Sequence, residues 1–171
     1  MHLFFNKRLI LISLCLVWAE LSLLSYLTIQ NVKPDFFFIF LVFYAFRVDY
    51  RSVVTLALCF GLVKDVFANS FFGLETSSYV GGSILLRFLA AKFDREKQWL
   101  QMISLFMFSW FSLILFSFFA LLVQKRYGFT PQVAVKAFLI SAYTTILGAL
   151  AIPLFDRWLG HTLRQKQYEL F

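Results

Sequence analysis

Residues 60–83 read FGLVKDVFANSFFGLETSSYVGGS, a stretch in which Lys64, Asp65 and Glu75 interrupt otherwise apolar or small residues. Charges in such a setting either lie within a membrane, where they need a partner, or mark its edge. The composition favours the membrane setting, because 61% of the 171 residues are hydrophobic and 15% are charged. Soluble domains have about 45–50% apolar and about 25% charged residues. The sequence therefore predicts an all-α, polytopic integral membrane protein.

Six apolar segments lie along the chain, and most approach the length of about 20 residues at which a helix spans a bilayer. We expect transmembrane helices at residues 9–29, 34–46, 52–70, 75–91, 99–123 and 132–155, followed by a cytoplasmic tail at 156–171. Pro34 and Pro131 are predicted at the first position of the second and sixth helices, where proline is favoured. The second segment is short, so it would need local bilayer thinning or snorkelling side chains. These segments predict a single membrane domain, residues 1–171, built as a bundle of about six helices.

Basic residues predict the orientation of the bundle. If the N-terminus is inside, three basic residues, Lys33, Lys125 and Arg126, lie in the outer segments. The cytoplasmic segments then hold ten: Lys7, Arg8, Arg47, Arg51, Lys92, Arg95, Lys97, Arg157, Arg164 and Lys166. Cytoplasmic loops carry an excess of lysine and arginine, so the pattern predicts an N-in, C-in topology. It also accounts for the net charge of +7 without a nucleic-acid partner.

The depth of the intramembrane charges follows from a rise of about 1.5 Å per residue. Glu20 lies about 18 Å from the cytoplasmic face on the first helix, and Lys64 lies at nearly the same depth on the third. A charge near the bilayer centre is costly without a partner, so Glu20 and Lys64 are predicted to pair. Two interpretations of Asp65 stay open: an interior contact or ligand site, or a residue that caps the outer end of the third helix.

Small residues predict where helices approach each other closely. Gly61 and Asp65 share one face of the third helix, and Gly81 and Gly82 lie with Ser78 on the fourth. Because small residues let helices pack closely in lipid, we expect these two faces to dock against each other. A small-molecule cavity between the two helices is the alternative.

No constellation of catalytic residues is apparent. His2 and His161 lie at opposite ends of the chain, and Asp65 is the only clear candidate for an intramembrane catalytic aspartate. The sequence has no glycine-rich phosphate loop. We therefore predict a protein without enzymatic activity, cofactor or metal.

Three segments, in this order and spacing, resemble the MreD family of bacterial rod shape-determining membrane proteins. They are VKPDFFFIFLVFYAFRVDYRS (32–52), ALCFGLVKDVFANSFFGLETSSYVGGS (57–83) and GFTPQVAVKAFLISAYTTILGALAIPLFDRW (128–158). The resemblance covers essentially the whole chain, although Lys64 occupies a position that is usually apolar in the family. The residues predicted to form the structural or partner-binding motif are Pro34, Gly61, Lys64, Asp65, Gly73, Gly81, Gly82 and Pro131.

The resemblance implies a multi-pass protein of the bacterial inner membrane that binds MreC and helps control peptidoglycan synthesis without catalysis. RodA, the elongation-specific penicillin-binding transpeptidase and MreB are implied as members of the same complex, and membrane lipid as the surroundings. The family also resembles the substrate-binding subunits of energy-coupling-factor transporters, so a small-ligand-binding transporter subunit is the alternative function. For the scaffold function, we predict that an exposed aromatic surface at 36–46 and the long fifth helix dock MreC.

Overall fold

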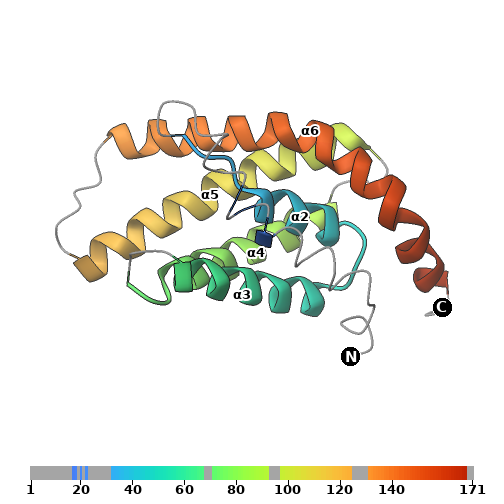
Figure 1. Cartoon of the computed structure of the whole chain (residues 1–171), viewed down its shortest axis with the longest axis horizontal. Coiled ribbons are helices and arrows are strands. Elements are labelled where there is room, and N and C mark those ends of the chain that lie inside the picture. The colour runs from blue at the N-terminus through green and yellow to red at the C-terminus, as the bar shows by residue number, and fades with distance from the viewer. Residues whose placement is uncertain are drawn as a thin grey trace.

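The described part of the chain is all-helical. The computed structural model describes residues 17, 18, 20, 22, 32–67, 71–92, 97–124 and 131–168, without the side chains of 124 and 158–168. These residues form five α-helices (Figure 1): α2 (Phe36–Ala45), α3 (Tyr50–Phe67), α4 (Leu74–Lys92), α5 (Gln98–Gln124) and α6 (Pro131–Tyr168). Most of the predicted first helix, 9–29, lies outside the described residues, although Val17, Trp18, Glu20 and Ser22 have helical backbone conformation.

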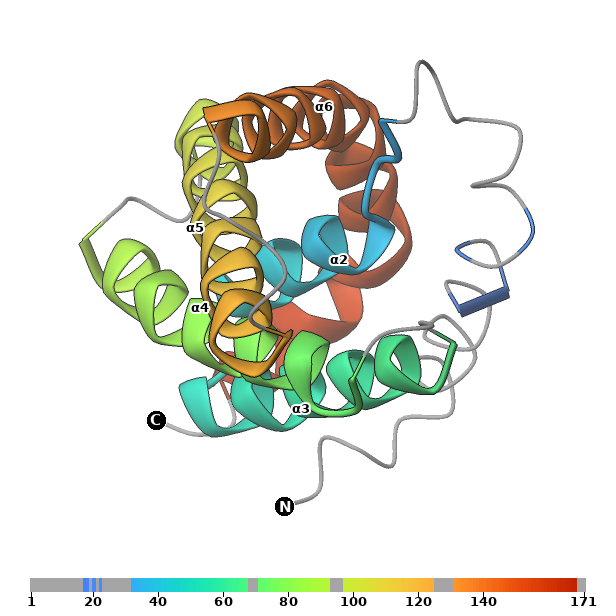
Figure 2. The same ribbon diagram turned by 90° about the vertical axis from the view of Figure 1, so that its left-hand side faces the viewer.

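Helices α3, α4, α5 and α6 follow one another in an arc, and α2 lies inside it (Figure 2). Every side chain from Phe37 to Tyr44 is buried. The ring of Phe37 stacks on Phe60 of α3, and the ring of Phe38 lies edge-on to Phe108 of α5. A helix that is apolar all round is typical of a position in the core. The predicted exposed aromatic surface at 36–46 is therefore wrong, because α3 to α6 cover it.

Helix α2 is also too short to span a membrane. Its 10 residues correspond to about 15 Å, half of a hydrocarbon core of about 30 Å. Pro34 is not at its first position as predicted, because Asp35 is the N-cap and the helix begins at Phe36. Pro34 and Asp35 are buried, so α2 begins within the bundle. Non-helical backbone at such a depth is tolerated where protein covers it, and no bilayer thinning is needed.

The outer surface of the bundle is apolar, whereas its interior contains many hydroxyl groups. Two of the described helices have segments long and apolar enough to cross a membrane, Gln98–Val123 and Pro131–Arg157. Their exposed large side chains include Trp99, Ile103, Met107, Phe111, Phe118, Phe138, Ile146, Leu150 and Leu154. The buried polar residues on the same helices include Ser104, Ser109, Ser112, Ser141 and Thr144. This distribution is typical of helices that pack through small and polar residues in lipid.

Glycines mark the closest helix contacts. A Cβ atom at Gly61 of α3 would lie 2.5 Å from the backbone Cα of Thr76, so α3 and α4 approach closely there. Gly81 and Gly82 instead lie against Leu115 and Ser112 of α5. The predicted docking of the two small faces is thus wrong for Gly81 and Gly82, which let α4 pack on α5.

Helix α6 extends beyond the predicted end at residue 155 and continues to Tyr168. Pro153 lies inside it and removes a backbone hydrogen bond, and the helix bends in its second half (Figure 1). Near this position Arg47, in the turn after α2, forms a 3.0 Å ion pair with Asp156. The ion pair joins the α2–α3 connection to α6 at the basic end of the bundle.

Candidate functional site

Asp35 lies at the centre of a buried cluster of charged and polar groups. As the N-cap of α2, its Oδ1 accepts hydrogen bonds from the backbone N–H groups of Phe37 (3.0 Å) and Phe38 (3.4 Å). Its own N–H donates to Oγ1 of Thr144 on α6 at 3.1 Å. N-cap carboxylates satisfy N–H groups that have no partner within the helix. Asp35 therefore starts α2 and attaches it to α6.

Lys64 is the cation of this cluster. Its Nζ forms an ion pair with Asp35 Oδ2 and lies 3.6 Å from Glu20 Oε1. Glu20 Oε2 in turn accepts a hydrogen bond from the backbone N–H of Phe36 at 3.0 Å. The predicted partners Glu20 and Lys64 are thus brought together, with Asp35 as a third member. The positive end of the α2 dipole adds to the charge that faces these two carboxylates.

Two aromatic rings enclose the ammonium group. Tyr79 of α4 is fully buried, and its hydroxyl donates to Asp35 Oδ2 at 2.6 Å. The Lys64 Nζ lies 5.4 Å from the centre of the Tyr79 ring and 5.7 Å from that of Phe38. These distances are within the range of cation–π attraction. The Asp35 carboxylate and these rings therefore connect α2, α3 and α4 around one charge.

Asp65 makes a separate interhelical contact. Its Oδ1 accepts from the Glu75 N–H at 2.9 Å, and its Oδ2 accepts from the Thr76 N–H at 3.0 Å and the Thr76 hydroxyl at 2.5 Å. Asp65 is buried in the last turn of α3, yet it caps the first turn of α4. It is an interior contact between helices and does not cap the end of its own helix.

Comparison with known proteins places the chain in a family. The family model described as rod shape-determining protein MreD matches residues 3–166, nearly the full length of the chain. The chain belongs to the MreD family. This is a membrane protein family with a role in rod shape determination. No curated protein and no solved structure matches the chain, so the likeness to energy-coupling-factor subunits stays a prediction.

The other residues predicted for the MreD motif lie outside the Asp35 cluster. Gly73 has a φ of 98° in the α3–α4 turn, a conformation that glycine adopts readily. Pro131 opens α6 and is exposed. Pro34 is buried beside the N-cap, and Gly81 and Gly82 lie at the α4–α5 contact. Gly73, Gly81, Gly82 and Pro131 thus hold separate packing and turn positions, whereas Lys64 of the same predicted motif belongs to the Asp35 cluster.

The sequence analysis did not identify two members of the Asp35 cluster, Tyr79 and Thr144. It also did not predict that Asp35 lies at the centre of the cluster. Tyr79 follows two serines on a small helix face, and Thr144 lies between Tyr143 and Thr145. Polar side chains inside apolar helices are signals for buried contacts. Their spatial convergence on Asp35 has no signature in the local sequence.

The donors at the start of α2 are used within the chain. The N–H groups of residues 35 to 38 all donate to Thr144, Glu20 or Asp35 itself. The described residues contain no group of three or more histidine, cysteine, aspartate or glutamate side chains able to hold a metal ion. The arrangement places the two carboxylates of Glu20 and Asp35 around the single ammonium of Lys64, and its effect is to join α2, α3, α4 and α6.

Proposed function

We propose that this MreD-family protein is a non-catalytic scaffold of the inner membrane that binds MreC and helps control peptidoglycan synthesis during rod-shaped growth. The family match over residues 3–166 carries the proposal. The buried cluster supports it, because the carboxylates of Glu20 and Asp35 and the ammonium of Lys64 satisfy one another. Such a cluster stabilises one arrangement of helices and gives partner proteins a constant surface.

The proposed topology is multi-pass with both termini in the cytoplasm. The basic residues support it, since cytoplasmic segments are enriched in lysine and arginine. In this orientation the turn at Arg47 and the start of α5 at Gln98 face the cytoplasm, and the α3–α4 turn faces outward. MreB would then meet the cytoplasmic side, whereas RodA and the elongation-specific transpeptidase join the complex through MreC.

We propose α5 as the docking surface for the single transmembrane helix of MreC. Trp99, Ile103, Met107 and Phe111 are exposed at intervals of four residues, so they form one stripe along the helix. Side-chain packing drives helix association in lipid. Since α2 is covered, α5 is the remaining one of the two predicted docking elements.

Cysteine cross-linking tests this surface. In a background with Cys15 and the exposed Cys59 replaced by alanine, Ile103→Cys and Phe111→Cys are expected to form disulfides with cysteines placed along the MreC helix. Leu150→Cys, exposed on α6, is the matched control and is expected to give no adduct. Docking on α5 would be contradicted if Leu150→Cys on α6 gave as much adduct as the α5 cysteines. It would also be contradicted if the α5 cysteines gave no adduct although both proteins were expressed.

Co-purification tests the scaffold function itself. Tagged protein extracted from native membranes in mild detergent is expected to retain MreC. If the wild type retains no MreC, the alternative function, a small-ligand-binding subunit of a transporter, becomes the better explanation. In that case, purified protein is expected to carry a small molecule that denaturation releases and mass spectrometry detects.

A further inference from the structure

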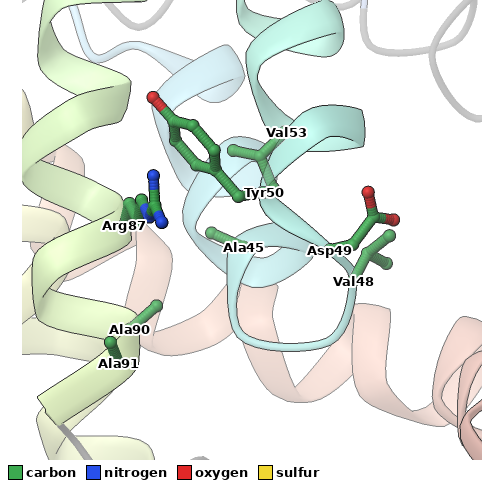
Figure 3. A pocket seen from close by; sticks show the side chains of 8 residues that line it. All are labelled: Ala45, Val48, Asp49, Tyr50, Val53, Arg87, Ala90 and Ala91. Atoms are coloured by element: carbon green, nitrogen blue, oxygen red, sulfur yellow. The ribbon is translucent and has the colours of Figure 1, made fainter.

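A half-open cavity of about 160 Å³ lies between the start of α3 and the end of α4 (Figure 3). It is at the end of the bundle that contains the α2–α3 turn with Arg47, away from the Asp35 cluster. Its lining residues are Ala45, Val48, Asp49, Tyr50, Val53, Arg87, Ala90 and Ala91. Pockets for drug-sized ligands usually measure roughly 300–1,000 Å³, so this cavity suits a smaller chemical group.

Arg87 gives the cavity its positive charge. Its guanidinium carbon lies 4.7 Å from the centre of the Tyr50 ring, and Figure 3 shows the side chain directed toward that ring. No carboxylate of the described residues forms an ion pair with Arg87, whereas Arg47, at the same end, pairs with Asp156 at 3.0 Å. The ring orients the Arg87 guanidinium and leaves its N–H donors available for an anion.

The nearest acidic side chain does not occupy these donors. Asp49 accepts from the N–H and hydroxyl of Ser52 at 3.3 and 2.8 Å. Figure 3 shows its carboxylate directed away from Arg87. The carboxylate stabilises the first turn of α3 instead. Among the described residues, no carboxylate therefore occupies the N–H donors of Arg87.

Apart from Asp49 and Tyr50, the rest of the wall is apolar and small. Val53 is buried, and Ala45 and Ala90 are half-buried beside it. A guanidinium beside small apolar side chains, with the Asp49 carboxylate bonded to Ser52 instead, matches a phosphate group attached to a glycerol ester. Exposed Arg51 lies at this end of the bundle, where basic side chains attract anionic lipids of the cytoplasmic leaflet.

We propose that this cavity binds the headgroup phosphate of an anionic phospholipid of the inner leaflet, with Arg87 as the phosphate ligand. The proposal rests on the membrane orientation proposed above and not on MreC binding. A guanidinium binds phosphate through two parallel hydrogen bonds, and an ammonium does not reproduce this geometry. The site therefore favours arginine over lysine at position 87.

Native mass spectrometry of the purified protein, titrated with phosphatidylglycerol, tests the site. The wild type is expected to retain one tightly bound lipid, and Arg87→Gln is expected to weaken its apparent affinity by about tenfold or more. Lys92→Gln makes the same charge change five positions later on α4, and its affinity is expected to stay within about twofold. Arg87→Lys is expected to lie between the wild type and Arg87→Gln.

A second variant separates shape from charge. Ala90→Leu fills the cavity without removing a charge and is expected to lose the lipid, while Ala149→Leu, exposed on α6, keeps it. This pair tests the cavity even if Arg87→Gln proves unstable. If Lys92→Gln lost as much affinity for phosphatidylglycerol as Arg87→Gln, the lipid would bind to a diffuse basic surface, and the proposed site would be wrong. Equal retention of phosphatidylcholine, or displacement by millimolar inorganic phosphate, would overturn an anionic lipid as its ligand.

Discussion

The hydroxyl of Tyr79 donates a hydrogen bond to Asp35 Oδ2 at 2.6 Å, although 44 residues separate the two in the sequence. The bond joins the middle of the bundle, where α2 begins, to α4. Tyr79→Phe keeps the ring and removes the donor, so it is expected to destabilise the protein by about 1.5–3 kcal/mol, the usual contribution of a hydrogen bond to a charged group. Thermal unfolding in detergent measures the change.

Tyr50→Phe is the control for this variant. The described residues provide no hydrogen bond to the Tyr50 hydroxyl, so this substitution is expected to change stability by less than about 0.5 kcal/mol. Equal unfolding temperatures for Tyr79→Phe and the wild type would show that the Tyr79 hydroxyl contributes nothing to the stability of the Asp35 contact.

Lys64→Met removes the only cation that pairs with Glu20 and Asp35 among the described residues. Two carboxylates then remain buried without a counter-charge, and a loss of about 3–5 kcal/mol is expected. Adding Glu20→Gln to Lys64→Met is expected to recover part of that loss, which a double-mutant cycle measures. Lys136→Met, at an exposed position of α6, is the matched control and is expected to unfold at the wild-type temperature. Additive effects of the two changes at Glu20 and Lys64 would argue against coupling in the cluster.

Asp65→Ala leaves the N–H groups of Glu75 and Thr76 without their acceptor. Loss of a helix N-cap costs about 0.5–2 kcal/mol, and Asp65→Asn is expected to be milder because its amide oxygen still accepts. Asp49→Ala removes a comparable cap at an exposed position, where water replaces the acceptor, and it serves as the control. Recovery of MreC by co-purification is expected to fall in the order wild type, Asp65→Asn, Asp65→Ala. If Asp65→Ala recovered as much MreC as the wild type, the role of Asp65 would be only to cap α4 locally.

Gly61→Ala places a methyl group 2.5 Å from the Cα of Thr76. Because a backbone atom cannot move aside cheaply, we expect a loss of about 1–3 kcal/mol from overpacking between α3 and α4. Gly81→Ala is the matched control, since its methyl would meet only the end of the Leu115 side chain, at 3.0 Å. Its stability is expected to stay within about 1 kcal/mol of the wild type, because alanine also favours the helix. Equal losses at both positions would contradict the close contact at Gly61.

The sequence was most informative where a single helix determines the pattern. The predicted segments 75–91 and 99–123 lie within α4 and α5, and for α5 length and hydropathy alone indicate the helix. The depth estimate also brought Glu20 and Lys64 to the same level, since helical rise is constant. The uniformly apolar character of 36–46 indicates burial in the core, and the predicted docking surface there is wrong.

The remaining features depend on how separate helices meet. Gly82 packs against Ser112 of α5, and this contact depends on how α4 is rotated about its own axis. Because α4 has small residues on two faces, its sequence does not indicate which face meets which neighbouring helix. The hydrogen bond from Asp35 to Thr144 joins positions 109 residues apart. No local pattern in either segment specifies the other. The length of α6 was underestimated because polar residues after Pro153 ended the apolar run without ending the helix.

The start of α2 within the bundle has a consequence for the order in which the chain is assembled. In lipid alone, the N–H groups of Asp35 and Phe36 would lack their acceptors and the charge of Asp35 would be exposed to hydrocarbon, which is costly. The acceptor for the Asp35 N–H, Thr144, is on α6, which follows the other described helices in the chain. We therefore expect α2 to reach its final position only after α6 has been synthesised. A nascent chain that stops before residue 144 lacks this contact. We therefore expect the bundle to be completed late in biogenesis, when α6 packs against α2.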